Sequence, residues 1–249
     1  MNSTFLRSAV DQFRMHATSP IAILSTLALP CVFAFVIHSS RAGSTGPTGT
    51  TSDLAVGSAG IGILDSAIVL VVLSLLGEKQ WKTLYAALGS PGGMVPLVLG
   101  RLTGIAVQTL VTVPGAFVVL ILIWGLDDGF AWGRWLVGGV LLAVSTTAVV
   151  GLLAVAVLRL PYSSGMVNGL TGLIMALSAL VVPQSALPES VQVLAQSMPQ
   201  AHVMTWVRGG SAGSLATAVA LTVGYAVVVV LLLRRVEYSA RRRAVPMEM

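Results

Sequence analysis

Six long apolar segments, each nearly free of charge, most constrain how this chain can fold. They occupy residues 20–37, 54–76, 102–126, 135–158, 165–182 and 212–233. A helix rises about 1.5 Å per residue, so about 20 apolar residues cross the roughly 30 Å hydrocarbon core of a bilayer. Only 9% of the residues are charged, against roughly 25% in soluble domains. We therefore expect an integral membrane protein that crosses the bilayer six times.

Segments of this length favour helices over the strands of a membrane barrel. A barrel strand is about ten residues long and alternates apolar with polar residues, whereas these segments are continuous. A helix also satisfies its backbone polar groups internally, as hydrocarbon requires. The predicted fold is all-α, with one polytopic transmembrane domain over residues 1–249 and no cleavable signal before the first span.

The basic residues predict the orientation of these helices. With six spans both termini lie on one side, and eleven of the fourteen Lys and Arg residues fall there. The other side carries Arg41, Arg134 and Arg208. Positively charged loops stay in the cytoplasm, so we expect both termini there. Because the basic residues flank apolar segments and form no single patch, nucleic acid is not an expected partner.

The N-terminal segment, residues 1–19, has the pattern of an amphipathic helix. Its apolar stripe and the opposite charged stripe are Leu6, Val10, Phe13 and Ala17 against Arg7, Asp11 and Arg14. Such a helix lies in the membrane interface. The alternative is an extension of the first span, against which Pro20 argues because proline suits a helix start.

Two segments between spans are also predicted to be helical. Residues 77–91 carry Glu78 and Lys82 as an i,i+4 pair and predict a short cytoplasmic helix that begins at Gly77. It contacts either a partner or only lipid head groups. Residues 183–211 are too polar to span, and Pro188 and Pro199 bracket an apolar stripe, which predicts an external re-entrant hairpin. The Gly, Ser and Thr-rich loop 41–53 is expected to be flexible.

Asp65 is the most unusual residue, because it lies at the middle of the second predicted span. A carboxylate at that depth is costly unless it is paired, protonated or in contact with water. Two interpretations stay open. Asp65 lines a substrate path or polar cavity, or it is a neutral acid hydrogen-bonded to a neighbouring helix, for instance through Gln108, Ser145, Thr146 or Asn168.

The sequence lacks the motifs of ATP binding, catalysis and metal binding. It contains no phosphate-binding loop of the form G-x-x-x-x-G-K-[ST]. The single cysteine and the scattered histidines, Cys31, His16, His38 and His202, predict neither a metal site nor a catalytic one. We therefore expect no enzyme and no cofactor in this chain. Gly165 and Gly169 have G-x-x-x-G spacing, which allows close helix approach in a bundle or a dimer.

The order of these features resembles the membrane subunit of type-2 ABC exporters over essentially the whole chain. The loop pattern E-[KR]-x-x-x-T-L, followed by a small residue and proline, is met by Glu78, Lys79, Thr83, Leu84, Ser90 and Pro91. The family often has glycine before the threonine, where this chain has Lys82. Pro188, Pro199 and Arg208 match the segment before the last span.

The resemblance implies a permease subunit in a bacterial cell membrane that exports a hydrophobic or amphipathic compound, such as a drug, an antibiotic, a lipid or a small peptide. It implies a second permease chain, identical or different, and two separate ATPase subunits that bind ATP and Mg. The coupling helix would be residues 77–91, with Glu78, Lys79, Trp81, Lys82, Thr83 and Leu84 at the ATPase contact. The substrate path would include Asp65, Gln108, Met166, Asn168 and Met175.

Two other classes of function stay open. A stand-alone carrier could use Asp65 as its proton site, but such carriers usually show internal repeats and more intramembrane charge than this chain has. A membrane-embedded enzyme is disfavoured by the missing catalytic motifs. Co-purification with an ATP-hydrolysing subunit would support the exporter. Transport by the chain alone under a proton gradient would support the carrier.

Overall fold

The computed structural model describes residues 2–20, 23, 28, 31–33, 35–36, 51–80, 88–89, 92–124, 131–159, 164–180, 182 and 184–244. Within these ranges the regular secondary structure is helical, and no residue lies in a strand. The prediction of an all-α fold is confirmed for this part of the chain. The first predicted span, residues 20–37, falls mostly outside the described residues.

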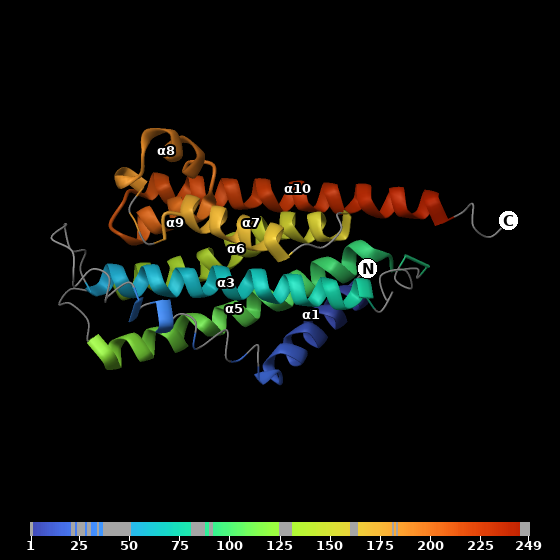
Figure 1. The fold of residues 1–249 in the computed structure, drawn as a ribbon, viewed down its shortest axis with the longest axis horizontal. Coiled ribbons are helices and arrows are strands. Elements are labelled where there is room, and N and C mark those ends of the chain that lie inside the picture. The colour runs from blue at the N-terminus through green and yellow to red at the C-terminus, as the bar shows by residue number, and fades with distance from the viewer. Residues whose placement is uncertain are drawn as a thin grey trace.

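Four long helices form the body of the described bundle: α3 (Thr51–Gln80), α5 (Met94–Trp124), α6 (Trp132–Arg159) and α10 (Ala212–Ala244). They run side by side along the long axis of the molecule (Figure 1). Three stretches in the described part are long and apolar enough to cross a membrane: Gly57–Leu75 within α3, Trp132–Arg159 and Ala212–Arg242. The chain is therefore a helical membrane protein.

Helix α3 is longer than the apolar segment that predicted it. It begins at Thr51, inside the predicted loop 41–53, and continues through Gly77 to Gln80. The helix expected to start at Gly77 does not start there, because Glu78, Lys79 and Gln80 are good helix formers and extend α3. Residues 81–87 lie outside the described ranges, so a coupling helix beyond Gln80 stays a prediction.

The other long helices contain most or all of their predicted spans and differ mainly at their ends. Helix α6 agrees with the predicted span 135–158 within three residues at each end. Helix α5 starts at Met94, well before residue 102, and α10 continues past residue 233 to Ala244. Backbone hydrogen bonds need no apolar side chains, so a helix can continue into water beyond its membrane-buried part. Hydropathy predicts the membrane-buried part and not the helix ends.

Helix α7 (Ser164–Leu177) is shorter than the predicted span 165–182. Its 14 residues give a length of about 21 Å, less than the hydrocarbon thickness of about 30 Å. The chain turns after Leu177, and Ala179 takes a φ of 51°. The Arg208 guanidinium donates hydrogen bonds to the carbonyl oxygens of Ala179 (2.9 Å) and Leu180 (2.7 Å). These bonds stabilise the turn, so the helix does not reach residue 182 as predicted.

Helix α3 is the central element. It contacts α5, α6 and α7, and its side chains Ile63, Leu64, Ala67 and Val71 are at most 1% exposed. Helix α1 (Asn2–Ala17) packs on α5, in agreement with a helix separate from the first span. Both ends of the described chain lie toward the same end of the bundle (Figure 1).

Three short elements occupy the segment predicted to be a hairpin: the 3-10 turn η1 (Gln184–Ala186), α8 (Glu189–Ala195) and α9 (Pro199–Val207). Helix α9 packs between α6 and α10, whereas α8 lies on the outside of the bundle (Figure 1). Pro188 directly precedes α8 and Pro199 is the first residue of α9, so the two prolines bracket the one helix α8. A re-entrant position of this pair of helices in the membrane stays a prediction.

Candidate functional site

Asp65 lies in the middle of the apolar part of α3. It is separated from Gly57 and Leu75, the ends of the apolar window, by about 12 and 15 Å of helical rise. Asp65 and Val69 are half-buried and Leu73 is 53% exposed, while the residues between them are buried. These three recur every four residues, so they form one edge of α3 that the rest of the chain covers least.

The neutral-acid interpretation predicts hydrogen bonds between Asp65 and a neighbouring helix, and the described residues do not form them. Ser145 donates to the Leu142 carbonyl at 3.1 Å instead. Gln108 and Thr146 are buried on α5 and α6, and Asn168 is exposed on α7. In the described part of the chain, the Asp65 carboxylate has no hydrogen-bond or ion-pair partner.

The remaining predicted substrate-path residues lie on α7. Asn168 is exposed, Met175 is half-buried against the core, and the side chain of Met166 is outside the described residues. A Cβ atom built on Gly169 or Gly172 would meet nothing within 4 Å. The close helix approach predicted for the glycine spacing is therefore not used within the described part of the chain, and this face of α7 is open.

Two of the six predicted coupling residues lie in the described ranges. Glu78 and Lys79 belong to the last turn of α3, and Trp81, Lys82, Thr83 and Leu84 lie outside the described residues. The backbone of Asp65 and that of Glu78 are therefore parts of one continuous helix.

The residues that follow the predicted coupling segment are held by α10. After Gly92, Gly93 takes a φ of 74°, and α5 begins at Met94. The Val95 amide donates to Glu237 Oε2 at 3.0 Å, and Arg241 donates to Glu237 Oε1 at 2.6 Å. A Cβ at position 93 would lie 2.6 Å from Glu237 Oε1, so both its φ and its neighbour favour glycine here. The Glu237 carboxylate thus caps the start of α5.

A buried polar cluster joins α1, α3 and α5, and the sequence did not predict it. Gln12 Oε1 accepts hydrogen bonds from Ser74 Oγ (3.1 Å) and from Arg101 Nη1 (3.0 Å), and the same Arg101 nitrogen lies 3.1 Å from Ser74 Oγ. Gln12 also bonds to His16, one helical turn on. The four residues come from three helices, so this cluster fixes α1 against the bundle.

The imidazole of His16 is 5% exposed inside this cluster. Its burial, and then the positive charge of Arg101, lower the pKa of His16 from its ordinary value. The signal in the sequence was the i,i+4 spacing of Gln12 and His16, on a face between the apolar and the charged stripes of α1. Arg101 was interpreted only as a topology-determining charge.

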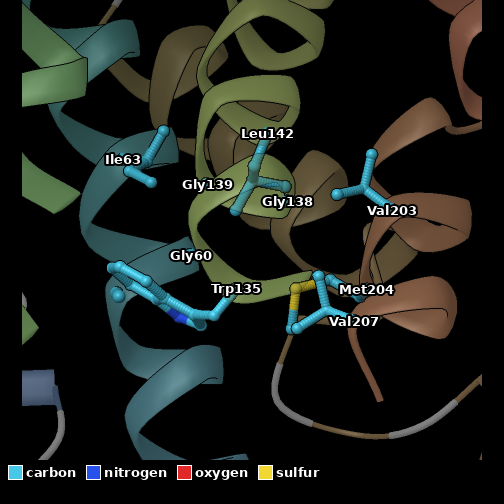
Figure 2. Close-up of a pocket in the computed structure, with 10 residues that line it drawn as sticks. Gly60, Ile63, Trp135, Gly138, Gly139, Leu142, Val203, Met204 and Val207 are labelled. Atoms are coloured by element: carbon cyan, nitrogen blue, oxygen red, sulfur yellow. The ribbon is translucent and has the colours of Figure 1, made fainter. Parts of the chain in front are cut away.

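A small apolar pocket lies between α3, α6 and α9 (Figure 2). Gly60 of α3 and Gly138 of α6 line it, and a Cβ on Gly138 would lie only 2.2 Å from Val207 Cγ2. Met204 and Val203 of α9 face Leu142 across it (Figure 2). Small residues therefore let α9 pack directly on α6.

Helix α9 is antiparallel to α6, so it leads back toward the end of the bundle where α6 begins. Its last turn lies near the start of α6, with the Arg134 guanidinium 5.9 Å from the Trp206 ring centre. Its first residues, Pro199 and Gln200, are buried. By helical rise, Gln200 is one turn further inward than Met204, about level with Thr146.

Gln200 and Thr146 leave buried polar atoms without hydrogen-bond partners in the described part of the chain. The atoms are both side-chain polar atoms of Gln200 and Oγ1 of Thr146. Buried polar groups in native proteins are almost always hydrogen-bonded. A water molecule or a polar ligand group at this place would supply the hydrogen bonds that these atoms lack. Elsewhere in the described ranges, no three His, Cys, Asp or Glu side chains are grouped to hold a metal ion.

We compared the chain with models of known protein families and with curated proteins, and neither comparison found a match.

Proposed function

We propose that the chain is the membrane-spanning permease subunit of an ABC exporter, moving a hydrophobic or amphipathic compound out of a bacterial cell. ATP and Mg would be bound by two separate ATPase subunits, and a second permease chain would complete the transporter. The observation that carries the proposal is the pair of open edges on α3 and α7. One holds Asp65 and the other holds Gly169 and Gly172.

These two edges need a neighbour that is not hydrocarbon. An intramembrane carboxylate without a partner costs free energy in lipid, so Asp65 requires a polar or protein environment. The glycine face of α7 suits a closely packed helix. Helices α3 and α7 contact each other. A second permease chain that covered both edges would leave a path past Asp65, and this is the dimer that the resemblance implies.

The path of α3 supports coupling to an ATPase. Thirteen residues, or about 20 Å of helix, separate Asp65 from Glu78 in one uninterrupted helix. A displacement at the predicted ATPase contact would therefore reach the membrane interior through a rigid element. Shortly after the 77–91 segment, Glu237 of α10 accepts a hydrogen bond from the Val95 amide at the start of α5. Both connections fit a segment that receives movement from another subunit.

The six-span topology with cytoplasmic termini belongs to this proposal. Three stretches are long and apolar enough to span, and α5 adds a helix of 31 residues whose second half lacks described side chains. The first predicted span and the short α7 are the fifth and sixth spans of the proposal. Helix α7 is short for a span, so it is either lengthened by neighbouring residues or matched by a locally thinner bilayer.

The dimer is tested by photo-crosslinking in native membranes. A photoreactive amino acid is placed at position 73, which lies on the same edge of α3 as Asp65. The matched control is position 223 on α10, where Val223 is 57% exposed. The proposal expects a protein adduct at position 73, with a second copy or another permease chain, and only lipid adducts at position 223. Lipid adducts alone at both positions would overturn the dimer.

The energy source is tested with inside-out membrane vesicles and a lipophilic cationic dye as the probe. The exporter predicts dye uptake that needs ATP and persists when the proton gradient is collapsed. Asp65→Asn is expected to reduce uptake or change the range of dyes, with expression unchanged. Trp81→Ala is expected to uncouple ATP hydrolysis from uptake in the complex purified with its ATPase. Normal transport in both variants would refute their assigned roles.

The second candidate is a proton-coupled carrier. The observation that favours it is the carboxylate of Asp65, which has no partner among the described residues. The carrier predicts that the purified chain alone transports in liposomes under a proton gradient, and that Asp65→Asn abolishes this. ATP would then have no effect. The same vesicle measurement therefore separates the two candidates.

A further inference from the structure

A second hollow lies between α1 and α5, away from the open edges of α3 and α7. Its volume is about 320 Å³, and ligand sites commonly occupy about 300–1,000 Å³. Helix α1 contributes Arg7, Asp11 and Gln12 to its walls, and α5 contributes Leu97 and Arg101. The proposed export function uses none of these residues.

The hollow lies where the apolar part of the bundle ends. Arg101 directly precedes the long apolar segment of α5. On α1, Leu6 and Val10 are 59% and 46% exposed, and an interfacial helix turns such side chains toward the acyl chains. Arg7 and Asp11 are exposed beside them. In a membrane, the mouth of the hollow is therefore at the depth of the lipid head groups.

Two guanidinium groups face this space from opposite walls. Arg101 is held in place by its hydrogen bonds to Gln12 Oε1 and Ser74 Oγ. Arg7 has no hydrogen bond or ion pair in the described part of the chain, so its donors are available. The Thr4 hydroxyl also lines the hollow. Guanidinium groups bind phosphate oxygens through charge-assisted hydrogen bonds, so this part of the hollow suits a phosphate.

Asp11 limits which phosphate compound fits. It lies one helical turn from Arg7, about 6 Å along the axis, and its carboxylate also has no partner in the described ranges. A simple anion would be repelled by this carboxylate. A group that carries both a phosphate and a primary ammonium would instead pair with both charges.

We propose that this hollow binds the phosphoethanolamine head group of a membrane phospholipid. The phosphate lies between Arg7 and Arg101, and the ammonium donates to the Asp11 carboxylate. Leu97 and Met15 provide the apolar part of the lining, which contacts the start of the lipid tails. The bound lipid fills the gap between α1 and α5. This inference rests on the membrane location of the chain and not on the export function.

The test is native mass spectrometry of the delipidated full chain with equal amounts of phosphatidylethanolamine, phosphatidylglycerol and phosphatidylcholine of matched acyl chains. The wild type should retain phosphatidylethanolamine above the other two. Arg7→Gln should weaken that binding about tenfold, the loss of one charge-assisted contact. Arg14→Gln is the matched control, because Arg14 is exposed on the same helix but does not line the hollow.

A second variant tests the role of the ammonium. Asp11→Asn should lose the preference for phosphatidylethanolamine over phosphatidylglycerol while still binding both, since the phosphate contact remains. Equal retention of the three lipids by the wild type, or an unchanged preference in Arg7→Gln, would overturn the proposal. So would displacement of the lipid by millimolar inorganic phosphate, because the site would then bind free anions and not a lipid.

Discussion

Helices α3 and α10 are similar in length and hydropathy but differ in their surroundings. Their apolar windows have mean hydropathies of 2.1 and 2.5, yet 83% of the α3 window is buried inside the structure, against 11% for α10. Helix α3 carries glycines and a carboxylate among its apolar residues, whereas exposed valines and leucines of α10 face outward. Lipid solvates an apolar surface as well as protein does, so packing and not hydropathy determines which helix becomes central.

The two helices also differ in where they are attached to the bundle. Most of the apolar window of α3 is buried, whereas the described side chains of α10 include three buried hydrophobic ones, Ala218, Val229 and Leu233. Beyond them, Glu237 caps the start of α5. We therefore expect substitutions along α3 to be costly and substitutions along α10 to be tolerated except near its cap.

The largest effect is expected from filling the space at Gly60 of α3. A Cβ there would lie 2.9 Å from Leu180 Cδ2 and 3.2 Å from Leu142 Cδ2, so Gly60→Leu should destabilise the protein by about 3 kcal/mol through overpacking. Gly224→Leu on α10 is the matched control, since a Cβ there meets nothing within 4 Å. Thermal unfolding in detergent measures both. Equal effects would contradict the contrast between the helices.

A smaller effect is expected from removing a buried side chain. Leu64 is fully buried on α3, and Leu231 is 57% exposed on α10. Leu64→Ala should cost about 2 kcal/mol, because the lost packing leaves a cavity. Leu231→Ala should stay within about 0.5 kcal/mol, as is usual for substitutions away from packed sites. Chemical unfolding in mixed micelles measures the free energy of unfolding of both variants. A large loss in Leu231→Ala would contradict an exposed α10 and indicate that this face of the helix lies in an interface.

Removing the cap at the end of α10 tests whether that helix is attached there. Glu237→Ala should cost about 1–2 kcal/mol, because the Val95 amide loses a charged acceptor. Arg241→Gln is the control: Arg241 pairs with Glu237 but is itself 49% exposed, so its loss should cost less than about 0.5 kcal/mol. Hydrogen exchange at the start of α5 should rise in Glu237→Ala alone. Unchanged exchange there would rule out the cap.

The smallest effect is expected from pH, through the polar cluster beside α3. Because the folded protein lowers the pKa of His16, its neutral form is favoured on folding. The resulting stability is present above pH 6.5, the ordinary value, and is lost as the pH falls through the lowered pKa. His16→Gln should flatten the decline in melting temperature over that range, and His202→Gln should leave it unchanged. A decline that is identical in all three proteins would exclude His16 as its source.

The sequence predicted the membrane helices better than their ends. Apolar length alone located α6 and the start of α10, because charged residues bound those segments closely. It could not predict that α7 stops at Leu177, since that turn depends on Arg208, 29 residues beyond Ala179. The extension of α3 through Gly77 was missed because glycine was interpreted as a helix boundary, although the residues after it favour helix.

The candidate site was predicted only in part. Asp65 stood out because one carboxylate in an apolar segment is rare, and its place on an open edge could not be known without the fold. The cluster of Gln12, His16, Ser74 and Arg101 needs contacts between residues 89 positions apart. The periodicity of one helix does not encode contacts with another helix, so the sequence pattern could not predict this cluster.

The cap on α5 has a consequence for how the protein is made. The ribosome synthesises the Val95 amide long before the Glu237 carboxylate that accepts its hydrogen bond, 142 residues later. During that interval water at the membrane surface must hydrate the start of α5, and Gly92 and Gly93 leave the preceding turn free to move. Insertion of α10 then replaces this water by a fixed acceptor. Helix α10 is therefore the last of the described helices to be synthesised, and its Glu237 carboxylate completes the hydrogen bonding at the start of the much earlier helix α5.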